Sequence, residues 1–147
     1  MLFRSSYCTL ENIKQRVPEQ VIFDLTQDDR NNSEINTTRV NAAIYDSDAI
    51  IDNKLRTRYS LPLAVIPNEL IRVAVDITVY FIYRARYDNT MPDAVKEAYN
   101  NAMTYLNALQ SGEESIISER ISGNDFTILT NQRARDRWYS KHVLRKI

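Results

Sequence analysis

The chain has 147 residues, 44% of them hydrophobic and 26% charged, and its 19 basic residues balance its 19 acidic residues. A folded chain of this length buries about 70% of the surface that its unfolded form exposes, so it can build a core without disulfides or metal. One cysteine excludes an intrachain disulfide, two glycines exclude glycine-rich phosphate loops, and one histidine excludes sites built on several histidines. The composition therefore favours a helical binding or assembly protein over an enzyme, with no cofactor and no bound metal.

Neither an export signal nor a membrane span is evident. Residues 1–10 contain no continuous apolar stretch before a small-residue cleavage site. The most apolar segment, residues 70–83, is 14 residues long and contains Arg72 and Asp76, whereas a spanning helix needs about 20 apolar residues. We therefore expect a protein that is not secreted and has no membrane partner.

Two short helices are predicted at the start of the chain, over residues 9–16 and 18–25. Thr9 is a suitable N-cap for the first, because its hydroxyl can accept a hydrogen bond from the first helical turn. Pro18 fits the first turn of the second, where its missing N–H has no partner to lose. Residues 27–36 are almost entirely polar, which is typical of a loop.

Three longer helices are predicted in the central part of the chain. Apolar residues recur at three- and four-residue spacing from residue 36 or 37 to about residue 59, and Pro62 prevents the helix from continuing. Residues 69–87 have only one narrow polar stripe, which indicates the central helix of a bundle. Pro92 begins the third helix, and Gly112 fits the position after its end, where φ is positive. The expected fold is an all-α bundle of three main helices with short N-terminal helices.

The pattern changes after residue 112. Apolar and polar residues then alternate, which predicts a β-hairpin or an extended arm. The chain thus divides into a helical domain, residues 1–112, and an arm, residues 113–147. Residues 131–147 carry six basic residues against one acidic residue, mixed with aromatic and aliphatic side chains, and such a tail is a candidate for docking on a partner. The candidate docking residues are Arg133, Arg135, Arg137, Trp138, Tyr139, Lys141, Leu144 and Arg145.

Several spaced motifs resemble those of one family. Residues 51–63 read I-D-N-K-L-R-T-R-Y-S-L-P-L, and residues 70–77 read L-I-R-V-A-V-D-I. A Y-x-T-x-E-x-I sequence occupies residues 7–13, and Y-x-x-A-x-x-x-L-x-x-L-x-x-G occupies residues 99–112. Over about residues 7–112 the chain resembles the Mu-like phage head-to-tail connector family, and the aromatic and basic tail at residues 138–145 is similar too.

The resemblance implies a structural adaptor without catalytic activity. Such subunits assemble as a ring, commonly of twelve copies, beneath the portal protein at the capsid vertex. The C-terminal arm is then expected to dock on the portal protein, and the opposite face to receive a stopper or tail-completion protein. DNA would pass through the ring lumen. The expected location is the neck of the virion, with the host cytoplasm as the site of assembly.

Arg72 and Asp76 lie four residues apart on the predicted central helix. A carboxylate on a mostly apolar helix is costly unless it is paired. We expect a structural ion pair, either between these two residues or between Asp76 and Arg56 or Arg58. The alternative, a catalytic acid, is less favoured because the sequence places no second carboxylate or nucleophile beside it.

The tyrosines of the two last helices allow two interpretations. Tyr80, Tyr83 and Tyr87 could stack on nucleic-acid bases, but their helical spacing favours packing in the core or at a ring interface. Arg84 and Arg86 could line a ring lumen or an interface. The basic tail supports an alternative function, a small nucleic-acid-binding protein, although the neutral charge of the whole chain favours docking on a protein.

Two further features, one loop and one cysteine, have structural rather than functional interpretations. The loop at residues 28–36 offers oxygen atoms at alternating positions, as calcium loops do, but it lacks the turn glycine and the bidentate glutamate. We therefore expect a solvated loop. Cys8 has no partner cysteine, and we expect a small buried apolar side chain.

Overall fold

The computed structural model describes residues 5–27, 32–86 and 90–116. This part of the chain contains five helices and no strand, which confirms the all-α class with two short helices before three long ones. The hairpin or arm expected within residues 113–147 lies, from residue 117 onward, outside the described residues. The helices are α1 (Leu10–Lys14), α2 (Glu19–Thr26), α3 (Thr37–Leu55), α4 (Asn68–Arg84) and α5 (Asp93–Ser111).

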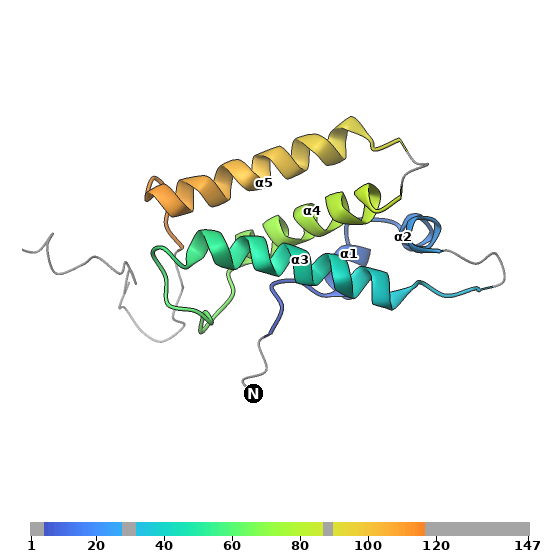
Figure 1. The fold of residues 1–147 in the computed structure, drawn as a ribbon, viewed down its shortest axis with the longest axis horizontal. Coiled ribbons are helices and arrows are strands. Elements are labelled where there is room, and N and C mark those ends of the chain that lie inside the picture. Colours follow the sequence, from blue (N-terminus) through green and yellow to red (C-terminus); the bar gives the residue numbers. More distant parts are fainter. Residues whose placement is uncertain (1–4, 28–31, 87–89, 117–147) are drawn as a thin grey trace, which may run out of the picture.

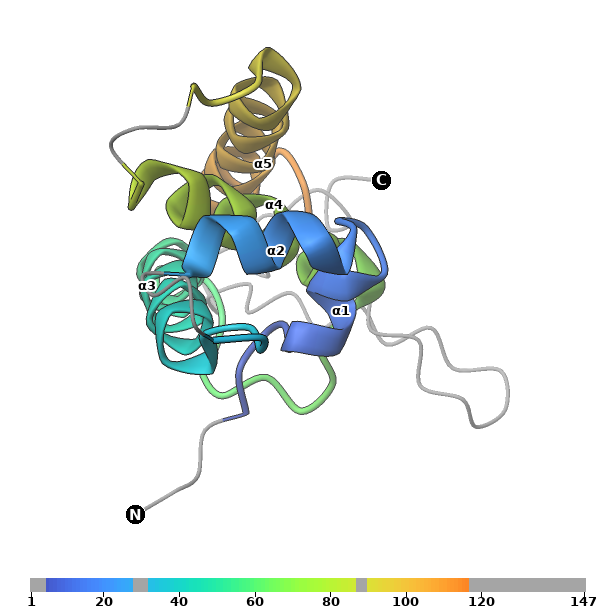
Figure 2. The ribbon, with the colours of Figure 1, turned by 90° about the vertical axis from the view of Figure 1, so that its right-hand side faces the viewer.

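The central position predicted for the helix of residues 69–87 is confirmed by α4. This helix packs against α3 on one side and α5 on the other, and α1 and α2 also contact it. The three long helices run in alternating directions (Figure 1). Figure 2 shows α1 and α2 lying across the end of the bundle at which α3 begins.

The apolar stripes of the long helices meet in one continuous core. Its completely buried side chains come from all three long helices and from both short ones, and examples are Ile13, Ile22, Val40, Ile51, Leu55, Leu70, Ile77, Leu106 and Leu109. Each such side chain stabilises the fold by about 1.5–3 kcal/mol relative to an exposed position. Among the described residues, no helix is long and apolar enough to cross a lipid bilayer.

The predicted helix caps are present. The Thr9 hydroxyl accepts a hydrogen bond from the backbone N–H of Asn12, whose side chain in turn accepts one from the backbone N–H of Thr9. Asn36, which was not predicted as a cap, caps α3 by accepting from the backbone N–H of Arg39. Gly112 follows α5 with a φ of 94°, the left-handed conformation that glycine adopts at low cost.

Several predicted boundaries differ by one to three residues, and the largest difference is at α3, which ends at Leu55 rather than near residue 59. Beyond Leu55 the chain forms a tight turn, in which the backbone N–H groups of Arg58 and Tyr59 both donate to the Leu55 carbonyl, at 3.0 and 2.8 Å. The Thr57 hydroxyl donates to the Lys54 carbonyl and adds to this turn. The connection that follows contains a cis peptide bond at Leu61–Pro62.

Candidate functional site

Two buried carboxylates of α3 hold the segment that precedes α1. The backbone N–H of Tyr7 donates to Oδ1 of Asp48 at 3.0 Å, and the Tyr7 hydroxyl donates to Oδ1 of Asp52 at 2.6 Å. Asp48 is 7% exposed and Asp52 is 3% exposed. These aspartates were not among the predicted site residues, although their position on the buried side of the predicted helix was a signal. Buried carboxylates with such partners are structural elements.

Asp76, the carboxylate of the predicted ion pair, lies on α4 near two arginines. Burial raises the pKa of the half-buried Asp76 carboxyl, and the nearby charges of Arg16 and Arg72 act in the opposite direction. No direct ion pair joins Arg72 and Asp76 in the described part of the chain. Arg58, proposed as another partner, instead donates to two backbone carbonyls near the end of α5.

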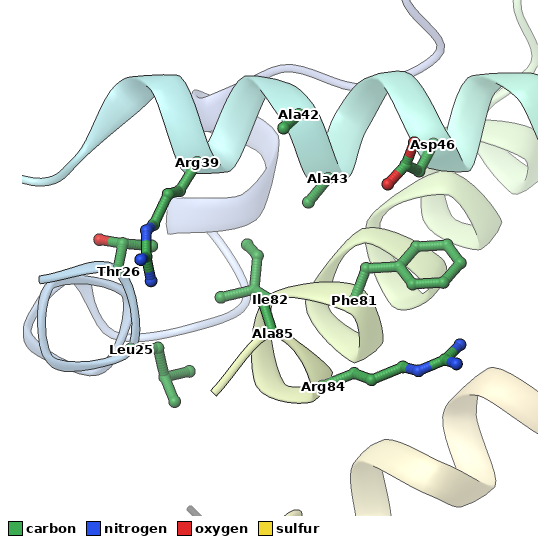
Figure 3. Close-up of a pocket in the computed structure, with 10 residues that line it drawn as sticks. All are labelled: Leu25, Thr26, Arg39, Ala42, Ala43, Asp46, Phe81, Ile82, Arg84 and Ala85. Atoms are coloured by element: carbon green, nitrogen blue, oxygen red, sulfur yellow. The ribbon is translucent and has the colours of Figure 1, made fainter. Parts of the chain in front are cut away.

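A pocket of about 470 Å³ opens between α2, α3 and α4. Its apolar lining includes Leu25 and Ile82. Figure 3 shows three charged side chains around it: Arg39 of α3, which extends toward α2, Asp46 of α3, and Arg84 of α4, which extends toward α5. Arginine beside apolar side chains is typical of protein-contact surfaces. The structure thus places Arg84 at the pocket, where it is exposed, whereas Arg86 is partly buried and is not part of the lining.

The packing interpretation of the tyrosines is confirmed where the structure describes them. The rings of Tyr80 and Tyr99 stack across the α4–α5 contact, with centroids 3.9 Å apart and planes 16° apart. Tyr83 and Tyr105 are partly buried against the core. Tyr87 lies outside the described residues.

The Cys8 side chain is buried, as expected. It is 1% exposed, and its sulfur lies 3.5 Å from the Thr78 hydroxyl. Burial raises the pKa of the thiol to about 11, which suppresses the reactive thiolate. Cys8 is therefore a small core residue.

The predicted docking residues of the tail, which begin at Arg133 and end at Arg145, all lie outside the described residues. The same is true of residues 28–31, which contain the first candidate oxygen ligands of the 28–36 loop. Contact with the helical body continues past the domain boundary predicted after residue 112, because Ile116 is only 7% exposed.

The motifs of the sequence are matched by one family model. The model described as "Bacteriophage Mu, Gp36" matches residues 7–123, which is most of the chain. The chain belongs to the bacteriophage Mu Gp36 family. No curated protein matches the chain. This Gp36-family protein is therefore a phage protein, and the resemblance to a Mu-like phage family is confirmed.

In this Gp36-family member, the residues that carry the resemblance occupy positions that define the fold. Tyr7 and Asp52 bond to each other, and Thr9 caps α1. Leu55 is completely buried, and Gly112 follows α5 in the left-handed conformation. These motif residues therefore specify how the helices are joined.

Proposed function

We propose that this Gp36-family protein is a head-to-tail connector, or adaptor, subunit of a tailed phage or prophage. It forms a ring that docks on the portal protein and bridges it to the stopper or tail-completion protein. The observation that carries the proposal is the family match over residues 7–123, combined with the connector-type motifs at residues 51–63 and 70–77. The protein acts as a structural component, without catalysis, at the neck of the virion after assembly in the host cytoplasm.

A ring of identical subunits needs two different complementary surfaces on each subunit. The bundle offers two, since α3 and α5 lie on either side of α4 and each exposes one face (Figure 1). The face of α3 presents Tyr45, which is 75% exposed and has the chemistry of an interface anchor. In the proposed ring of twelve copies, the α5 face of one subunit contacts the α3 face of the next. Arg84 and Arg86 then face the interface or the lumen through which DNA passes.

Docking on the portal protein is assigned to the basic tail, residues 131–147. Its six basic residues suit an acidic groove and would steer the encounter, while Trp138 and Tyr139 supply apolar area for the bound state. Because the body has mixed charge, we assign the charge-dependent step of portal docking to the tail.

Native mass spectrometry with the portal ring of the same genome tests the proposal. We compare the wild type with a full-length variant in which Arg133, Arg135 and Arg137 are changed to glutamate. The control changes an exposed body residue, Arg56, to glutamate. We expect one copy per portal subunit for the wild type and the control, and loss of binding for the tail variant.

The same experiment separates the connector from the alternative, a small nucleic-acid-binding protein. Binding of DNA with a steep salt dependence, together with no binding of the portal ring by the folded wild type, would favour the alternative. Binding of the portal ring that is insensitive to the tail charges would reject the role given to residues 131–147 and leave the body as the docking element.

A further inference from the structure

The C-terminal end of α5 is held by residues at the end of α3. One guanidinium nitrogen of Arg58, Nη1, donates to the carbonyl of Leu109 at 3.2 Å and to the carbonyl of Glu114 at 3.3 Å. Nζ of Lys54 donates to Oε1 of Gln110 at 3.2 Å. The last carbonyls of a helix lack partners and carry partial negative charge, so cationic donors are favourable there.

The contact continues beyond the end of the helix. The backbone N–H of Glu114 donates to the carbonyl of Ala108 at 3.1 Å, and the backbone N–H of Ile116 donates to the Tyr59 hydroxyl at 3.1 Å. The Ile116 side chain is buried against the body. The chain is therefore attached, as far as residue 116, to the turn that follows α3.

These contacts exceed what is needed to terminate a helix. A left-handed glycine alone is a sufficient C-terminal cap, and Gly112 supplies it. Arg58 and Tyr59 add bonds to residues on both sides of this glycine, and they belong to a different part of the bundle. Their combined effect is to hold residues 109–116 at one place on the body.

We propose that Arg58 and Tyr59 are positioning residues that fix the point from which residues 117–147 leave the body. This clamp, defined as Lys54, Arg58 and Tyr59 with residues 109–116, makes every subunit present its tail from the same place. The inference rests on the proposed docking of the tail on the portal protein. Its benefit is entropic, because a tail that leaves the body at one fixed place loses less freedom when it docks.

Release of residues 109–116 would let the tail leave the body from many places instead of one, so docking of the tail should weaken. Loss of the hydrogen bond to the Ile116 N–H also accelerates exchange of that amide by about two- to tenfold.

The test uses full-length variants with matched controls. Tyr59→Phe removes only the hydroxyl that accepts from Ile116, and Ser60→Ala, which removes the exposed hydroxyl of the next residue, is its control. Arg58→Met removes the guanidinium donors and keeps the apolar stem, and Arg56→Met is its control at an exposed position. Arg58→Lys retains the charge and is expected to restore part of the effect.

Amide hydrogen exchange and portal binding are both measured. We expect faster exchange at Gly112 to Ile116 and weaker portal binding for the two clamp variants, with unchanged exchange at Leu106 in the core and unchanged controls. Unchanged exchange at Ile116 overturns the clamp. Faster exchange with wild-type portal affinity overturns the positioning role.

A wild type that does not bind the portal ring overturns the proposed function and, with it, the positioning role. The exchange data then show where the error lies. Protection at Ile116 that depends on Tyr59 means that the clamp exists and the connector function is wrong, whereas absence of that protection means that the clamp itself is wrong.

Discussion

The hydroxyl oxygen of Tyr7 lies 2.6 Å from a carboxylate oxygen of Asp52, which is 45 residues further along the chain. Both side chains are almost completely buried, so the bond forms away from bulk water. A hydroxyl that donates to a carboxylate makes a short and strong hydrogen bond. This bond joins the N-terminal segment to the second half of α3 and sets the position from which α1 begins.

Removal of the Tyr7 hydroxyl should destabilise the protein. Tyr7→Phe keeps the ring in the core and deprives the Asp52 carboxylate of one donor, which costs about 1.5–3 kcal/mol. Chemical denaturation of the two proteins measures this difference. Tyr45→Phe is the control and should leave the midpoint unchanged, because Tyr45 is 75% exposed. Equal stability of wild type and Tyr7→Phe would show that the bond contributes nothing net.

The charge of Asp76 should reduce stability at neutral pH. Burial raises the pKa of its carboxyl above the ordinary value of 3.8, so the native state binds this proton more tightly than the unfolded state does. Stability therefore falls as pH rises through about 4 and above, and the loss is complete once the native carboxyl is ionised. We expect Asp76→Asn to raise the melting temperature at pH 7 and to have little effect near pH 3.

The exposed Asp46 of α3 supplies the control for this measurement, as Asp46→Asn removes the same charge without the burial. A lower melting temperature of Asp76→Asn at pH 7 would contradict the expectation. It would mean that attraction to Arg16 and Arg72 outweighs the cost of burying the carboxylate.

Substitution of Gly112 should be costly for two separate reasons. Its φ of 94° is strained for a residue with a side chain, at about 1–2 kcal/mol, and an added Cβ would lie 3.0 Å from Nη1 of Arg58. We expect Gly112→Ala to lower the free energy of unfolding by at least this amount. Gly112→Asn should cost less for the backbone, because asparagine tolerates the left-handed conformation better. A neutral Gly112→Ala variant in urea denaturation would refute the prediction.

The Cys8 thiol should be almost inert in the native protein. Its pKa is raised from 9.0 to about 11, so near pH 8 the thiolate is about a hundredfold scarcer than in the unfolded chain. Burial adds a steric barrier. Because Cys8 is the single cysteine, mass spectrometry of maleimide labelling reports on it alone. Labelling of the native protein within tenfold of the rate for the urea-unfolded protein would contradict this expectation.

Most of the secondary structure was predictable because the signals that determine it are local. A cap acts within one helical turn, so Thr9 and Gly112 indicated helix ends that the structure reproduces. The spacing of apolar residues indicated which face of each long helix is buried. The end of α3 was predicted four residues too late, because the turn at Arg58 and Tyr59 retains bonds to Leu55 that resemble a helix.

The sequence by itself determined the three long helices, their buried faces and the concentration of positive charge in residues 131–147. Only the tertiary structure decided that Arg16 acts on Asp76, that Arg58 binds the end of α5 and that Arg84 shares a pocket with Arg39. Spacing along one helix specifies neighbours within that helix alone. Which residues of two different helices meet depends on how the helices cross, and the crossing is set by the packing of the whole core.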